Sequence, residues 1–141
     1  MERFTQDDAR ADASALVLYD EDCGFCRWSA DRLRVWDRHA RLAFSSIQAA
    51  DRAGRLDAIP PELRYESWHL ITPDARIWSS GAAVAPMMRR LPGGPTIAAI
   101  ADTFPGTIER AYRFVARHRR RLGAILGQQA CAVDPGREVR R

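Results

Sequence analysis

Residues 16–26, with the sequence LVLYDEDCGFC, decide the fold of this chain. The run 16–19 is short, continuous and apolar, which is typical of a strand buried on both faces. Three acidic residues at 20–22 follow and indicate a sharp loop. Beyond the loop the apolar side chains recur at the helical period. The stretch therefore predicts a strand, a loop and a helix that begins beside Cys23 and Cys26.

The rest of the chain predicts a crossover unit that is followed by a hairpin. The expected elements are a strand at 42–47, a short helix at 48–56, a hairpin of strands at 68–72 and 77–78, and helices at 82–91, 96–101 and 107–122, with Gly123 ending the last. This order predicts an α/β fold with a mixed central sheet of about four strands, flanked by helices and followed by extra C-terminal helices.

The length and composition fit one domain in a chain of 141 residues, of which 46% are hydrophobic. We expect a flexible leader at 1–13, the domain at 14–126 and a weakly structured tail at 127–141. No apolar run approaches the roughly 20 residues that cross a bilayer, so no transmembrane segment is expected. The leader is acidic and lacks the apolar core of an export signal, which favours a cytoplasmic location.

The Cys-Gly-Phe-Cys spacing at 23–26 indicates redox chemistry because of where it lies. Backbone N–H groups at the start of a helix stabilise a thiolate, which lowers the pKa of the first thiol. Two intervening residues bring the second cysteine round one turn, within reach of a mixed disulfide on the first. Cys23 is therefore expected to be the nucleophile and Cys26 the resolving thiol, with no cofactor and no metal required.

Asp20 has two interpretations. It closes the strand beneath the cysteines, where it would accept or relay the proton of Cys26 while Glu21 and Asp22 face the solvent. The alternative is an ordinary turn or capping residue.

A zinc site is the alternative to redox chemistry for the pair, with further ligands drawn from Cys131, His39, His69 or His118. No second closely spaced cysteine pair exists. The rival function is therefore a small zinc-stabilised or Arg-rich interaction module without catalysis.

Positive charge is concentrated near the C-terminus, where residues 107–141 hold nine Arg and three acidic residues. Most of these arginines should lie on a solvated helix face, and without a nucleic-acid-binding signature no nucleic-acid partner is expected. An acidic protein partner or an anionic membrane surface remains open. Arg119 lies on the apolar stripe of Tyr112, so we propose an acidic partner for it, Asp20 above all, or else a stem packed on the core with its head in water.

Aromatic residues surround the cysteine motif. Phe25, with the neighbouring Gly24, is expected to contact the substrate, and Trp28 is expected beneath the disulfide. Cys131 is expected to be a passive thiol or, if mobile, an additional resolving or intermolecular thiol.

The stretch Tyr19-Asp20-Glu21-Asp22-Cys23-Gly24-Phe25-Cys26 resembles the signature of the DCC family of predicted thiol-disulfide oxidoreductases. The likeness extends to the hairpin at 68–78 and to the Tyr and Arg segment at 112–119. It implies a thioredoxin-like fold, Cys23 and Cys26 as the redox pair, and a disulfide-containing protein or a small thiol as substrate, with an electron donor that is not identified. Two positions depart from the pattern: Glu21 replaces a common glycine, and residues 65–67 lack the cis-proline that thioredoxins carry before their third strand.

Overall fold

The computed structural model describes residues 14–127, which form a four-stranded sheet in the order β2-β1-β3-β4. The strands are β1 (Ala15–Tyr19), β2 (Leu42–Ser46), β3 (His69–Ile71) and β4 (Ile77–Ser79). β1 pairs in parallel with β2 and antiparallel with β3, and β3 pairs antiparallel with β4. This mixed sheet with flanking helices confirms the predicted thioredoxin-like α/β fold.

β1 lies inside the sheet and is covered on both faces, as its continuous apolar sequence predicts. Leu16 and Leu18 pack with Ile47 of the helix that follows β2. Val17, which points to the opposite face, packs in a second cluster with Leu33 of the helix that follows β1. The end of this buried strand therefore holds the following loop in a fixed position.

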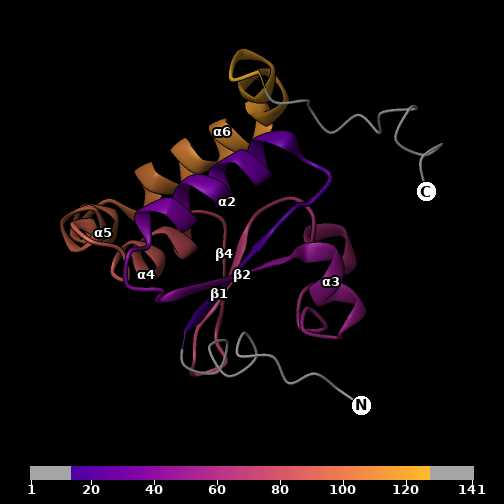
Figure 1. Cartoon of the computed structure of the whole chain (residues 1–141), viewed down its shortest axis with the longest axis horizontal. Coiled ribbons are helices and arrows are strands. Elements are labelled where there is room, and N and C mark those ends of the chain that lie inside the picture. The colour runs from indigo at the N-terminus through magenta and orange to yellow at the C-terminus, as the bar shows by residue number, and fades with distance from the viewer. Residues whose placement is uncertain (1–13, 128–141) are drawn as a thin grey trace.

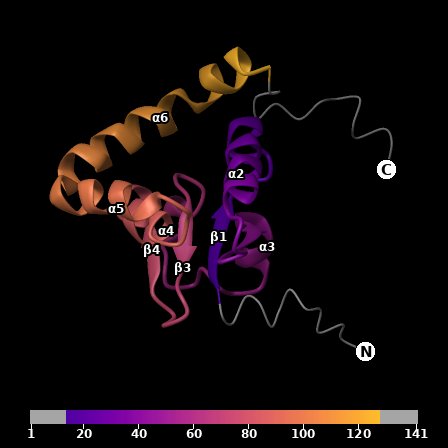
Figure 2. The same cartoon turned by 60° about the vertical axis from the view of Figure 1, so that its left-hand side comes forward.

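Helices cover the two faces unequally. They are α2 (Gly24–Trp36), α3 (Ile47–Arg52), α4 (Val84–Met88), α5 (Gly94–Thr103) and α6 (Pro105–Ile125), with short 3-10 turns η1 (Pro61–Leu63) and η2 (Ser80–Ala83). Figure 1 shows α6 running beside α2, with α3 on the other side of the strands. Figure 2 shows that α5 leads directly into the long helix α6.

Two hydrogen bonds connect α6 to the residues around the β3–β4 hairpin. The hydroxyl of Tyr112 accepts a hydrogen bond from the backbone N–H of Trp68 at 2.8 Å. The carboxylate of Glu109 accepts from the backbone N–H of Gly81, also at 2.8 Å. These contacts place the middle of α6 beside the residues that precede and follow the β3–β4 hairpin.

Several predicted boundaries are wrong by a few residues. The predicted helix at 82–91 is a 3-10 turn at Ser80–Ala83 followed by the short α4. Strand β2 ends at Ser46, because the Ser46 hydroxyl accepts from the Ala49 N–H at 3.0 Å and so begins α3. Gly123 is buried inside α6, and Gly127, with φ of 71°, takes the left-handed conformation beyond its end.

The predicted leader and all but the first residue of the predicted tail, including Cys131, lie outside the described residues, so these boundaries stay predictions. Within residues 14–127, every helix is too short or too polar to cross a lipid bilayer.

Candidate active site

Cys23 and Cys26 lie at the start of α2, directly after the loop that ends β1. Cys23 is the N-cap residue, and its carbonyl accepts from the Arg27 N–H at 3.0 Å as the helix begins. Its own N–H donates to the Asp20 carbonyl at 3.2 Å, which closes the loop. Both cysteines carry thiols, and they are only 0% and 2% exposed. The fold thus fixes the pair between a buried strand and a helix N-terminus.

The Cys26 side chain lies in surroundings that favour its thiolate. A hydrogen bond from the Cys23 side chain lowers the pKa of the Cys26 thiol below its usual value, against the opposing effect of burial. The positive charge of Arg119 and a hydrogen bond from the Trp68 side chain lower this pKa further, whereas Asp20 raises it. Because the two sulfurs share a hydrogen bond, the ionisation belongs to the pair rather than to one thiol.

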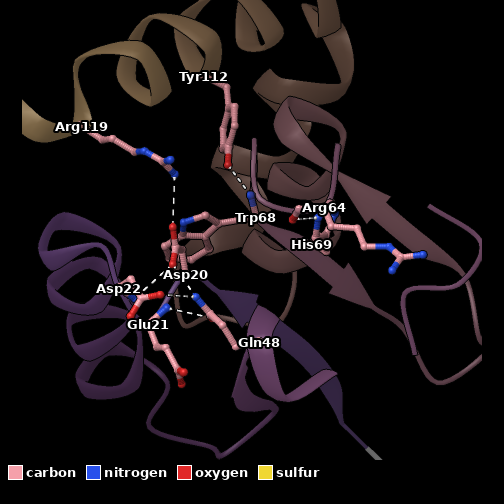
Figure 3. Close-up of polar contacts among 9 residues, drawn as sticks. All are labelled: Asp20, Glu21, Asp22, Gln48, Arg64, Trp68, His69, Tyr112 and Arg119. Atoms are coloured by element: carbon pink, nitrogen blue, oxygen red, sulfur yellow. Dashed lines mark hydrogen bonds and ion pairs between the residues drawn. The ribbon is translucent and has the colours of Figure 1, made fainter. Parts of the chain in front are cut away.

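Gln48 holds the acidic loop before the cysteines. Its side-chain Nε2 donates to Asp20 Oδ1 at 2.7 Å and to Asp22 Oδ2 at 3.1 Å, and its Oε1 accepts from the Glu21 N–H at 3.2 Å (Figure 3). Asp20 Oδ1 also accepts from the Asp22 N–H at 3.0 Å. Asp20 thus accepts a hydrogen bond within the loop, and it is buried while Glu21 and Asp22 are exposed. Its role in proton transfer stays a prediction.

The second oxygen of Asp20 faces Arg119. Arg119 Nη1 lies 3.9 Å from Asp20 Oδ2, and both side chains are mostly buried, with exposed fractions of 27% and 12% (Figure 3). The structure thus contains the contact that the sequence suggested for Arg119. It joins the C-terminal helix to the loop before the cysteines, and both members influence the ionisation of Cys26.

Tyr112 of α6 lies in the same site and lines the groove that contains Cys26. Figure 3 shows Tyr112 and Arg119 reaching from α6 toward the strand side of the site. Burial raises the pKa of Tyr112 to about 12, against the hydrogen bond from the Trp68 N–H, which lowers it. The phenol is therefore neutral at physiological pH and serves as an acceptor that positions Trp68.

A groove of about 380 Å³ opens beside Cys26 between α2 and α6. Its lining is largely apolar and includes Phe25, Trp28, Trp68 and Tyr112. Phe25 and Trp28 stack with their ring centroids 6.1 Å apart. Sequence reasoning placed Phe25 and Trp28 near the pair but did not anticipate a groove shared with the C-terminal helix.

Other predicted site residues take less accessible positions. Gly24, the first residue of α2, is buried.

Three side chains of this site were missed by sequence reasoning: Gln48, Ser67 and Trp68 as a partner of Cys26. Gln48 had a usable signal, because it follows the carboxyl end of a strand that pairs in parallel with β1, with Ser46 opposite Tyr19. Residues 20 and 48 therefore had to meet at one edge of the sheet. Nothing in the sequence marked Ser67, which lines the groove.

The candidate metal ligands do not gather. Within residues 14–127, no three His, Cys, Asp or Glu side chains come together in a way that holds a metal ion. His69 is buried and bonded to the Ser79 hydroxyl at 2.7 Å and the Arg64 carbonyl at 2.8 Å, and His118 bonds to the Phe114 carbonyl. Cys131 lies outside the described residues.

The comparisons with known proteins agree with this geometry. A family model described as DCC1-like thiol-disulfide oxidoreductase matches residues 17–124, which include most of β1, the cysteine pair, the hairpin and nearly all of α6. No curated protein and no solved structure matches the chain. Since the match covers well over half of the sequence and the paired thiols lie where the motif requires them, the chain belongs to the DCC1-like thiol-disulfide oxidoreductase family.

Proposed function

We propose that this protein catalyses thiol-disulfide exchange, with Cys23 and Cys26 alternating between a dithiol and a disulfide. The observation that carries the proposal is the hydrogen-bonded pair of thiols at the N-terminus of α2, beside a cationic guanidinium and an apolar groove. Helix N-termini and nearby cations are the surroundings that make cysteines reactive.

In the proposed reaction, the Cys23 thiolate attacks one sulfur of a substrate disulfide. The substrate S–S bond breaks, a mixed disulfide forms on Cys23, and the first substrate thiolate leaves and takes up a proton. Cys26 then attacks the Cys23 sulfur, which forms the Cys23–Cys26 disulfide and releases the second substrate thiol. The substrate gains two electrons and two protons, and the protein loses them. An electron donor must later restore the dithiol.

The shared hydrogen bond supports both steps. Loss of one proton from the pair leaves a single negative charge that the second thiol and Arg119 stabilise. The charge can move from Cys26 to Cys23 by transfer of the proton between the sulfurs, because the pair titrates as a unit. Asp20 is proposed to take part in this proton movement, since its carboxylate acts on Cys26 and contacts Arg119.

The groove is the proposed approach for the substrate. Both sulfurs are nearly inaccessible in the reduced state, so exchange requires a small displacement of the surrounding side chains. We propose that Phe25 and the Gly24 backbone contact the substrate and that Trp28 supports Phe25 by stacking. Arg119 and Tyr112 act as positioning residues from α6. A substrate is expected to be a disulfide-containing protein or a small thiol compound in a reducing compartment such as the cytoplasm.

Trapping separates the two cysteine roles. We would prepare Cys26→Ser and Cys23→Ser in a Cys131→Ser background and use that parent as the control. Each reduced protein is mixed with bis(2-hydroxyethyl) disulfide, quenched with acid and weighed by mass spectrometry.

We expect a lasting adduct on Cys23 in the Cys26→Ser protein and a much slower adduct in the Cys23→Ser protein. The parent should pass to the internal disulfide without accumulating an adduct. An adduct that persists only in the Cys23→Ser protein would reverse the order of attack. A parent that keeps both thiols would remove the proposed function.

A further inference from the structure

A second and larger cavity, of about 780 Å³, shares Tyr112 with the groove as a lining residue. A volume of this size is typical of small-molecule sites. Three arginines of α6, Arg113, Arg117 and Arg119, line the cavity, and within residues 14–127 Glu66 is the only acidic residue in its lining. The cavity is therefore a cationic hollow.

The cavity and the groove border each other. Five residues line both of them, namely Glu66, Ser67, Tyr112, Ala116 and Arg119. The groove also contains Cys26, so a ligand that reaches over this shared border touches the redox site at one end and the arginines at the other.

Among the described residues, no acidic side chain neutralises the positive charge of Arg117, so this charge can interact with a ligand. Arg113 forms an ion pair with Glu109 at 2.8 Å, and Arg119 is paired with Asp20. Within residues 14–127, the guanidinium of Arg117 has no acidic partner and contacts only the Arg113 carbonyl, from Nε, at 3.4 Å. An exposed cation at the wall of a cavity can bind a carboxylate at little desolvation cost.

The lining of the cavity also includes two serines, one of which has an unusual backbone conformation. Ser79 and Ser80 line the cavity, and the Ser79 hydroxyl is held by the buried His69. Ser80 has φ of 54°, a conformation that non-glycine residues rarely adopt and that clusters at functional sites.

We propose that this cavity, which we call the arginine cavity, binds the carboxylate of a small disulfide or thiol substrate while its sulfur reaches the cysteine pair. The inference rests on the proposed function and names the substrate class: low-molecular-weight disulfides that carry a carboxylate. Arg117 supplies the main charge-assisted contact, with Arg113 as its neighbour one turn earlier on α6. The exchange itself follows the balanced reaction given above.

The test compares three disulfides that differ in charge. They are 3,3′-dithiodipropionate, which is anionic, bis(2-hydroxyethyl) disulfide, which is neutral, and cystamine, which is cationic. Single-turnover oxidation of the reduced protein is followed for each, and every rate constant is divided by that of dithiothreitol in solution with the same disulfide. This division removes the intrinsic reactivity of each compound.

We expect the normalised rate to be highest for the anionic disulfide and lowest for cystamine. Arg117→Gln should lower the anionic-to-neutral ratio by about threefold to fivefold, the effect of one partly exposed charged contact. Arg121→Gln is the matched control, because Arg121 is an exposed arginine of α6 that lines neither hollow, and it should leave the ratio unchanged.

Equal normalised rates for all three disulfides would overturn the proposal, and so would an equal fall of the ratio in the Arg117→Gln and Arg121→Gln proteins, which would indicate net charge rather than the cavity. Failure of the proposed function differs from both, because the cysteine pair would then be oxidised by none of the three compounds.

Discussion

Two charged side chains of opposite sign, Arg119 and Asp20, act on the ionisation of the cysteine pair. Arg119 lowers the pKa of Cys26 and Asp20 raises it. They also face each other, with 3.9 Å between Nη1 and Oδ2. Neutralising either one should therefore shift the thiol titration, and the two shifts should have opposite signs.

Arg119→Gln is expected to raise the pKa of the Cys26 thiol, because the thiolate loses a nearby positive charge. The pH profile of iodoacetamide alkylation of the reduced pair should move to higher pH, and alkylation at neutral pH should slow. Arg120→Gln, at an exposed position next along the same helix, is the control and should leave the profile in place. An unshifted profile in Arg119→Gln would show that the guanidinium does not act on the pair.

Asp20→Asn is expected to lower the pKa of the Cys26 thiol, since it removes a repulsive carboxylate and leaves Arg119 without its acidic partner. The alkylation profile should move to lower pH, and the pH dependence of substrate reduction should change with it. Asp22→Asn provides the matched control, because Asp22 is exposed and bonded to the same Gln48. Reduction kinetics that stay the same across pH would exclude a role for Asp20 in proton transfer.

At the residue scale, the sequence identifies the reactive residues of the site more easily than the residues that surround them in space. Asp20, Cys23 and Cys26 lie within seven consecutive residues, so a local pattern identifies them. Gln48 comes from 28 residues farther along the chain than Asp20, and only the parallel pairing of β1 with β2 brings the two together. Residues of this kind become visible only once the strand order is known.

The close approach of α6 to η2 is the element contact that holds the C-terminal helix over the site. A Cβ added at Gly81 would lie 2.6 Å from Glu109 Oε2 and 2.7 Å from Glu109 Cα. Only glycine leaves room there for the helix backbone and for the hydrogen bond from the Gly81 N–H.

Gly81→Ala is expected to destabilise the protein by about 2 kcal/mol, because α6 must move away from η2. Urea unfolding would measure the change. Gly106→Ala is the matched control, since nothing lies within 4 Å of the added Cβ in the first turn of the same helix, and it should raise stability by about 0.5 kcal/mol. Equal stabilities for the two variants would argue against tight packing at Gly81.

Tyr112→Phe is expected to lower the free energy of unfolding by about 1 kcal/mol, because the Trp68 N–H loses its acceptor. Chemical denaturation of the two proteins measures this. The groove should also loosen, so the same variant should slow oxidation of the pair by the neutral disulfide. A variant as stable and as active as the wild type would show that the Tyr112 hydroxyl does not position Trp68.

At the element scale, the order of strands and helices follows from the sequence while the helix ends do not. The helix predicted at 82–91 is shorter in the structure, because its first residues belong to η2, where Gly81 packs against Glu109, and α4 spans only Val84–Met88. The end predicted at Gly123 is too early, since a buried glycine within a helix permits close packing as readily as it permits a turn. Local patterns cannot distinguish these two uses of glycine.

Across the whole molecule, the uneven distribution of charge along the chain determines where basic side chains lie in the fold. The first 106 residues hold more acidic than basic residues, and the basic excess lies in the C-terminal part. Through Arg119, α6 brings part of that positive charge to the acidic loop, and through Arg113 and Arg117 it brings another part to the neighbouring cavity. The sequence indicated that this asymmetry existed, but only the packing of α6 beside α2 relates it to the cysteines.

The most direct test of the proposed function measures whether Cys23 and Cys26 are oxidised when the reduced protein is mixed with a disulfide. The full chain is reduced, freed of reductant, mixed with an excess of bis(2-hydroxyethyl) disulfide, quenched with acid and digested for peptide mapping. We expect a disulfide joining Cys23 to Cys26, with two equivalents of 2-mercaptoethanol released by oxidation of the pair, in addition to any equivalent released by modification of Cys131. Recovery of both cysteines as unreacted thiols, with modification confined to Cys131, would contradict it.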